Sequence, residues 1–137
     1  MRRRLAEAHE AAAGNPWEVK LGPGRMMDIE ILAQTGALLC TLTVRRPGQM
    51  LDRLGTVGWL SRPDAALLSR ALDRLHTLQQ IGRLASDHTI DPAEGGDGLV
   101  RLVLHATGMQ DLDTLRRGLA DDAARAAAII TDRLARA

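Results

Sequence analysis

The residues best suited to chemistry lie close together, in a glycine-bearing segment that runs from Lys20 to Gln34. Lys20 is the single lysine in a chain that also holds seventeen arginines. Because a lysine ammonium is a compact charge on a flexible stem, a site that needs one would resist replacement by the planar arginine fork. The residues of this segment whose types could do chemistry or shape a tight turn are Lys20, Gly22, Gly24, Asp28, Glu30 and Gln34.

The same segment does not make a complete nucleotide site by itself. Pro23 removes a backbone N–H donor that a phosphate cradle would use, and the Gly-Lys-Ser/Thr ending of a P-loop is missing. In a helix Asp28 and Glu30 point about 200° apart around the axis, so they cannot share a metal ion. Asp28 also fits a simpler interpretation, because a carboxylate in the first helical turn is favoured by the helix dipole.

Other catalytic and metal-binding arrangements are also missing from the sequence. The four histidines do not pair at helical ligand spacing, and the single cysteine, Cys40, lies in an apolar stretch. No motif marks a nucleophile with an activating partner. We therefore predict no catalytic residue, no metal site and no cofactor bound by this chain.

Composition excludes several further classes of protein. The formal net charge is +1, with acids and bases interspersed, so no strong field attracts nucleic acid or anionic lipid. No apolar run is long enough for a membrane span, and no apolar region follows the arginines near the N-terminus. We expect a cytoplasmic protein that binds neither nucleic acid nor membrane.

The elements that must position the candidate residues are predicted to be helices, because β-branched and aromatic residues are scarce. The segment 25–44 has two overlapping apolar faces, which predicts a central helix. Further helices are expected at 2–13, 49–60, 62–86, 98–106 and from 111 to the last residues, with a loop at 87–97. The expected fold class is all-α, a single helical bundle of five or six helices.

One helical domain should span residues 1–137. Within it we expect a linker helix at 1–13, a Lys/Gly loop at 14–24 and the bundle at 25–137. The apolar stripe of the linker helix is small, so that helix is expected to pack against a partner that this chain does not contain.

The block from Lys20 to Gln34 resembles the loop and Asp-Ile-Glu…Gln helix of the bacterial glutamine synthetase adenylyltransferase family. The stretch Met50-Leu51-Asp52-Arg53-Leu54, followed by Trp59-Leu60-Ser61, is similar too, so the resemblance covers essentially the whole chain. Two positions depart from the family pattern. Arg25 stands in place of the second glycine of a pair, and Ile31 in place of an aromatic residue.

The resemblance implies the helical domain that follows a nucleotidyltransferase domain, in the carboxyl-terminal, adenylylating half of an enzyme of nitrogen regulation. The parent enzyme would use ATP and magnesium and would have glutamine synthetase and the PII signalling protein as partners. This fragment would contact the upstream nucleotidyltransferase domain and would be inactive alone. By the same resemblance, its interdomain or phosphate-facing residues would be Lys20, Gly22, Gly24, Asp28, Glu30 and Gln34. Two alternatives stay open: a stand-alone helical protein-interaction module, and the equivalent domain of a PII uridylyltransferase.

Overall fold

A computed structural model of the chain describes residues 14–86 and 91–137, and within these ranges the ordered elements are helices. They are α2 (Met26–Leu39), α3 (Pro47–Thr56), α4 (Arg62–Ala85), the 3₁₀ turn η1 (Pro92–Gly95), α5 (Asp97–Thr107) and α6 (Leu112–Arg136). The predicted all-α class is confirmed. The predicted linker helix at 1–13 lies outside the described residues.

The helix at the centre of the bundle is α4, because it packs against α2, α3, α5 and α6. It begins at a standard cap, where the Ser61 hydroxyl accepts a hydrogen bond from the Asp64 backbone N–H and Pro63 follows in the first turn. Its apolar repeat is buried from Ala65 to Ile81, through Leu68, Leu72, Leu75 and further members: Ala65, Leu67, Ala71, Leu78 and Ile81. Leu84, in the last turn, is exposed.

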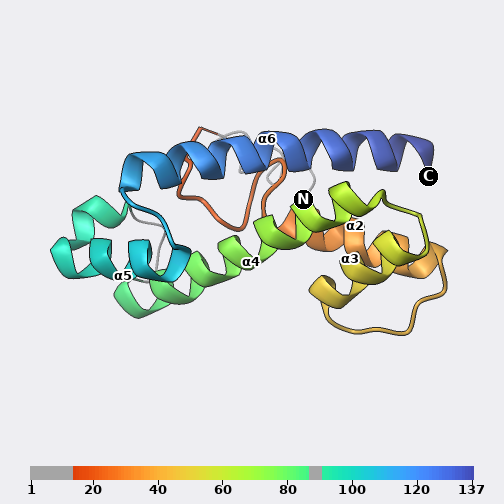
Figure 1. Ribbon diagram of the computed structural model, residues 1–137, viewed down its shortest axis with the longest axis horizontal. Coiled ribbons are helices and arrows are strands. Elements are labelled where there is room, and N and C mark those ends of the chain that lie inside the picture. Colours follow the sequence, from red (N-terminus) through yellow and green to blue (C-terminus); the bar gives the residue numbers. More distant parts are fainter. Residues whose placement is uncertain (1–13, 87–90) are drawn as a thin grey trace, which may run out of the picture.

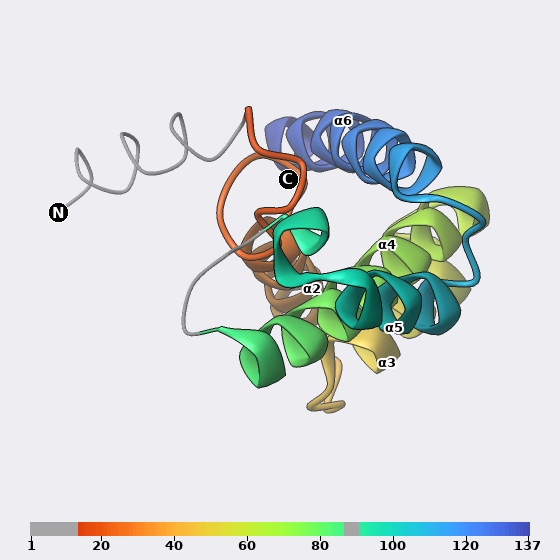
Figure 2. The same ribbon diagram turned by 90° about the vertical axis from the view of Figure 1, so that its left-hand side faces the viewer.

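The second long helix, α6, runs along the length of the molecule beside α4, with α5 at one end and α2 and α3 at the other (Figure 1). Its N-terminus is capped by the Asp111 carboxylate, which accepts a hydrogen bond from the Thr114 N–H at 2.7 Å. Arg74 of α4 donates to the Asp122 carboxylate at 2.8 Å, which joins the two long helices. Viewed from the α5 end, the loop before α2 lies next to α6 (Figure 2).

The helix predicted at 25–44 is shorter than expected and is not the central one. It ends at Leu39, where Thr41 adopts φ 56° and the Leu42 N–H donates to the Ala37 carbonyl at 2.8 Å. This is the hydrogen bond of a Schellman ending, in which the left-handed residue is usually glycine. A threonine in that role gave no sequence signal, so the predicted boundary was five residues too late.

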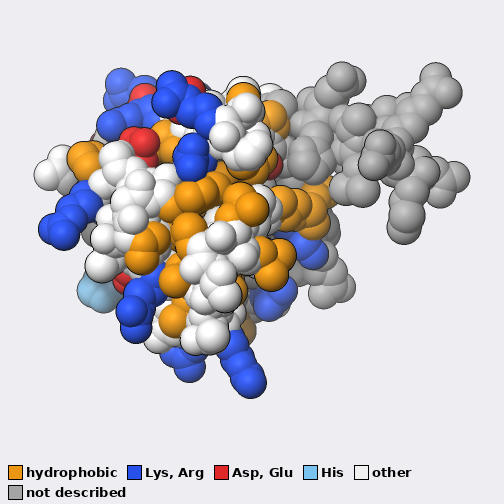
Figure 3. Space-filling view, turned by 90° about the vertical axis from the view of Figure 1, so that its right-hand side faces the viewer, with side chains coloured by type: hydrophobic (Ala, Val, Ile, Leu, Met, Phe, Trp, Pro, Cys, Tyr) orange, Lys and Arg blue, Asp and Glu red, His pale blue; other side chains and the backbone are white. Residues whose placement is uncertain are grey.

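One of the two predicted apolar faces of α2 is exposed. Ile29 and Leu32 are fully buried, whereas Ile31 is 49% exposed and Leu38, on the same outward side, is 83% exposed. The prediction of a helix buried on most sides was therefore wrong. The end of the molecule that lies on the right in Figure 1 shows hydrophobic side chains with basic ones around them (Figure 3). The exposed apolar side chains at the ends of α2, α3 and α6, called the apolar end face below, are Leu38, Leu39, Val57 and Leu134.

The other boundaries moved less. Proline at the first helical position lets α3 begin at Pro47 rather than at the predicted Gln49, and it ends at Thr56 rather than at residue 60. The region predicted as a loop at 87–97 contains the turn η1, capped by the Asp91 carboxylate on the Ala93 N–H. Trp59, which follows α3, packs its ring against Gly36 and lies 4.3 Å below the Arg133 guanidinium.

Candidate functional site: the Lys/Gly loop and its junction with the bundle

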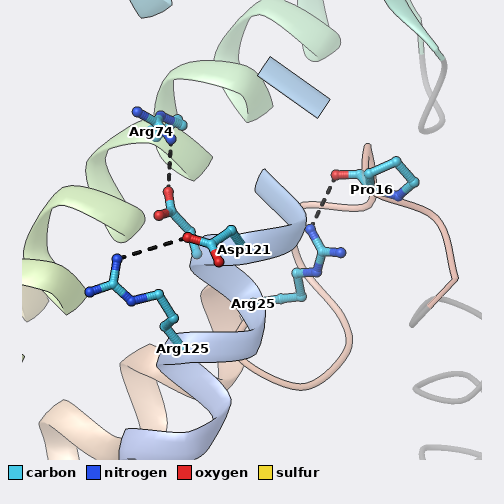
Figure 4. Close-up of polar contacts among 6 residues, drawn as sticks. Pro16, Arg25, Arg74, Asp121 and Arg125 are labelled. Carbon is cyan, nitrogen blue, oxygen red and sulfur yellow. Dashed lines mark hydrogen bonds and ion pairs between the residues drawn. The ribbon is translucent and has the colours of Figure 1, made fainter. Parts of the chain in front are cut away.

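The Lys/Gly loop is held by the side chain of the residue that follows it. Arg25 is only 4% exposed, and its guanidinium donates to the Pro16 carbonyl at 3.1 Å (Figure 4). It also donates to the Asn15 carbonyl at 3.4 Å. The loop therefore closes on itself, because one side chain joins the residue after its end to two residues near its start. Burial lowers the pKa of Arg25 below its usual range, while the nearby Glu18 carboxylate opposes that shift.

The two glycines of the loop have different roles. Gly22 has φ 117° and Gly24 has φ 70°, both in the left-handed region that favours glycine. Gly24 also lies against the backbone of α6: a Cβ atom there would lie 2.8 Å from the Ala123 carbonyl carbon and 2.9 Å from the Ala127 nitrogen. Gly24 is thus the point at which the loop contacts the last helix of the bundle.

Asp28 and Glu30 point to different partners, as their separation around the helix requires. The Asp28 carboxylate accepts a hydrogen bond from the Gly24 N–H at 2.8 Å, which holds the end of the loop against the first turn of α2. His76 Nε2 of α4 lies 3.3 Å from Glu30 Oε1, so Glu30 accepts a hydrogen bond when that nitrogen carries a proton. Gln34 is exposed on the outward side of α2.

Lys20 is exposed at the outer part of the loop. Its backbone N–H and that of Leu21 both donate to Glu18 Oε1 at 3.0 Å, so the Glu18 carboxylate shapes the turn that presents the lysine. The structure thus brings Gly24 and Asp28 together and leaves Lys20, Glu30 and Gln34 apart from one another. Among residues 14–86 and 91–137, no group of three or more His, Cys, Asp or Glu side chains is placed to hold a metal ion.

A cavity of about 290 Å³ lies beside Lys20, between the loop, the second half of α4 and the segment of η1 and α5. Trp17, Lys20, Gln79 and Arg83 contribute to its wall. No pattern in the sequence indicates this arrangement, because its members come from distant segments. The isolated Gly82 inside a helical pattern was a weak signal, since glycine lowers helix stability relative to alanine.

The sequence did not predict the hydrogen bonds of Arg25 or the contact of His76 with Glu30. In the sequence, Arg25 was noted only because it replaces a glycine of the family pattern. Its neighbours in the chain did not indicate that the guanidinium binds the carbonyls of Asn15 and Pro16. His76 lies 46 residues from Glu30, and pairing across that separation depends on how α2 and α4 cross. Within the described residues, no helix is long and apolar enough to cross a membrane.

The chain belongs to the family described as GlnD PII-uridylyltransferase, whose model matches residues 1–118. It is also similar to proteins named bifunctional glutamine synthetase adenylyltransferase/adenylyl-removing enzyme. The Rhodopseudomonas palustris (strain HaA2) protein is 31% identical over 131 residues, and the Xanthobacter autotrophicus protein is 33% identical over 127 residues.

These matches cover 92% and 89% of this chain but 13% of the length of each relative. The Rhizobium meliloti protein of the same name is 36% identical over 106 residues, which is 72% of this chain and 11% of the relative. The chain therefore corresponds to a small part of these enzymes, and that part is helical here. No solved structure matches the chain significantly.

Proposed function

We propose that this chain is the helical, non-catalytic domain of a glutamine synthetase adenylyltransferase, in its carboxyl-terminal, adenylylating half. The observation that carries the proposal is the match to enzymes of that name. The match extends along almost the whole of this chain and covers 13% of the length of each enzyme. A segment of that size is a domain of a larger protein. In the intact enzyme AMP would pass from ATP to a tyrosine hydroxyl of glutamine synthetase, and pyrophosphate would leave.

The exposed apolar side chains support a role inside a larger protein. Leu38 is 83% exposed and Leu39 is 58% exposed, and both belong to the apolar end face. Contiguous apolar surface of this kind marks contacts with other proteins or domains. In our proposal the ATP and magnesium of the reaction are bound by an upstream nucleotidyltransferase domain, and the helical domain braces that domain.

The Lys/Gly loop is the part of this chain that we assign to the domain junction. Arg25 and Asp28 fix the loop at its base, while Lys20 stays exposed at its outer part. A fixed loop presents its lysine at a defined place, which lowers the entropy cost of binding. Lys20 would contact a phosphate of the nucleotide or a carboxylate of the catalytic domain. Glu30 and Gln34 would bond across the same interface.

A second candidate function is favoured by the family description itself, which names a PII-uridylyltransferase. In that case UMP rather than AMP would be transferred, and the PII protein rather than glutamine synthetase would receive it. The curated relatives favour the first candidate, because those compared above are named as adenylyltransferases. For the first candidate we place the PII protein among the regulatory partners and the enzyme in the cytoplasm.

The experiment that separates the candidates is a transfer assay with the complete protein encoded by the gene. It is incubated with Mg²⁺ and radiolabelled ATP or UTP, with purified glutamine synthetase or PII protein as acceptor. We expect label on glutamine synthetase from ATP and none on PII from UTP. Labelling of PII from UTP alone would replace the first candidate by the second, and no labelling in any combination would refute both. This chain alone should label neither acceptor.

A further inference from the structure

The cavity beside Lys20 has an apolar interior and a cationic mouth. Its volume is about 290 Å³, close to the lower limit for small-molecule sites, and it is open to solvent. Three separate segments of the chain build it, so its shape depends on the complete fold. The apolar members of the wall are Trp17, Val19, Leu78, Ile81, Leu99 and Val103.

Two positive charges stand at the mouth of this cavity. Lys20 comes from the loop and Arg83 from the last turn of α4, and both side chains are exposed. Within the described part of the chain neither forms an ion pair. The one acidic residue in the wall, Glu18, accepts hydrogen bonds from two backbone N–H groups and faces the Arg25 charge. Among the wall residues that the structure describes, two cations therefore stand against one carboxylate.

Gly82 leaves space at the cavity wall. A Cβ atom at Gly82 would meet nothing within 4 Å, although the residue lies within α4, in its last turn. Glycine inside a helix costs about 0.5–1 kcal/mol relative to alanine, and here no neighbouring atom requires it. Any larger side chain at position 82 would reduce the open volume.

We propose that this cavity binds a small organic anion, with an apolar body inside and one carboxylate or phosphate group between Lys20 and Arg83. The volume admits about ten non-hydrogen atoms if each takes up roughly the 30 Å³ of a water molecule. A single anionic head matches the unpaired charges at the mouth, and an apolar body matches the wall. The binding site does not depend on the proposed transferase role, because every residue in it belongs to this chain.

The two tryptophans of the chain allow a direct test. Trp17 lies in the cavity wall, whereas Trp59 lies at the other end of α4 under Arg133. We would titrate the ¹⁵N-labelled chain with phenylacetate, phenyl phosphate or the neutral analogue phenylacetamide and follow both indole N–H signals. The expected result is a saturable shift of the Trp17 signal with at least one anion, a weaker shift with the amide, and no shift of the Trp59 signal.

Matched variants locate the binding site. Lys20→Ala and Arg83→Ala should each weaken anion binding roughly fivefold, as expected for loss of one partly exposed charge contact, while Arg45→Ala should not. Gly82→Leu should abolish the Trp17 shift by filling the cavity, while the same substitution at Gly48, where a Cβ atom also meets nothing within 4 Å, should leave it intact.

Three results would overturn the proposal. They are an unshifted Trp17 signal with both anions, equal binding of phenylacetamide, and full binding by the Gly82→Leu variant. Because the assay uses only this chain and small probes, a negative result leaves the transferase proposal standing. Failure of the transferase assay equally leaves the cavity proposal standing.

Discussion

The backbone of Gly24 lies directly against the backbone of Ala123, so the loop before α2 and the last helix of the bundle touch without any side chain between them. A Cβ atom at position 24 would overlap the Ala123 carbonyl oxygen, and it would lie 2.9 Å from the Ala127 nitrogen. Backbone atoms cannot rotate away as the end of a side chain can. This contact fixes where the Lys/Gly loop leaves the bundle, and with it the position of Lys20.

Gly24→Ala should be strongly destabilising. The variant combines a left-handed backbone with a clash against α6, and we expect a loss of about 2–4 kcal/mol in the free energy of unfolding. Urea unfolding followed by circular dichroism measures this loss. Gly58→Ala is the matched control, because Gly58 has φ 82° but a Cβ atom there meets nothing within 4 Å. The control should cost about 1 kcal/mol, from the backbone conformation alone. Equal costs at the two positions would show that the contact with Ala123 is unimportant.

Arg25→Met should destabilise the loop by removing the hydrogen bonds from the guanidinium to the Asn15 and Pro16 carbonyls. The substitution keeps an apolar stem of similar length but leaves the Asn15 and Pro16 carbonyls without their donor, which costs about 1–3 kcal/mol. Urea unfolding measures the change in the free energy of unfolding. Arg83→Met is a control at an exposed position and should change that free energy by less than about 0.5 kcal/mol. If Arg25→Met unfolds at the wild-type urea concentration, the side chain does not hold the loop.

Thr41→Gly should stabilise the protein by about 1 kcal/mol. Thr41 is the non-glycine residue with positive φ in the described chain, and a β-branched side chain is disfavoured in that conformation. The gain is limited because glycine also increases the entropy of the unfolded chain. Thermal unfolding with a matched Thr43→Gly control, at an exposed position nearby, measures the difference. A lower melting temperature for Thr41→Gly than for the control would contradict the Schellman ending.

The helix boundaries show what the sequence could and could not predict. The starts of α4 and α6 were predicted, because the caps Ser61 and Asp111 act through local hydrogen bonds that their own neighbours receive. The end of α2 was predicted five residues too late, because it depends on a left-handed Thr41 that no residue preference indicates. Helix caps can be predicted from sequence, because they depend on neighbouring residues. An unfavourable backbone conformation that the surrounding structure stabilises cannot.

The candidate site shows the same division. Asp28 was read correctly as a first-turn carboxylate, and the structure gives its partner as the Gly24 N–H. Burial of Arg25, pairing of Glu30 with His76, and the cavity between Lys20 and Arg83 all depend on segments brought together by the packing of α4. No spacing along the chain encodes those contacts.

Acidification should weaken the start of α6. Hydrogen bonds from the backbone N–H and the side chain of Thr114 lower the pKa of Asp111, and a hydrogen bond from Arg116 lowers the pKa of Asp113. A carboxylate with a lowered folded-state pKa contributes stability that is present above its unfolded pKa, near 3.8, and is lost as pH falls through the folded value. Stability should therefore decline below about pH 4.

Asp111→Asn keeps a capping oxygen but removes the titration, so its unfolding free energy should fall less between pH 5 and pH 3 than that of the wild type. Asp52→Asn is a control at an exposed position where no such cap exists. An identical pH profile for Asp111→Asn and the wild type would show that the Asp111 cap does not contribute to the acid sensitivity.

The most direct measurement of the central claim is the adenylylation rate of the complete protein with Lys20→Ala, with glutamine synthetase as acceptor. We propose that Lys20 lies on a fixed loop at the boundary with a catalytic domain. The rate should therefore fall at least about tenfold, the loss expected when a positioned charge is removed, with the urea midpoint unchanged. Arg45→Ala should keep the wild-type rate. A wild-type rate for Lys20→Ala, at unchanged stability, would contradict a direct role for the loop.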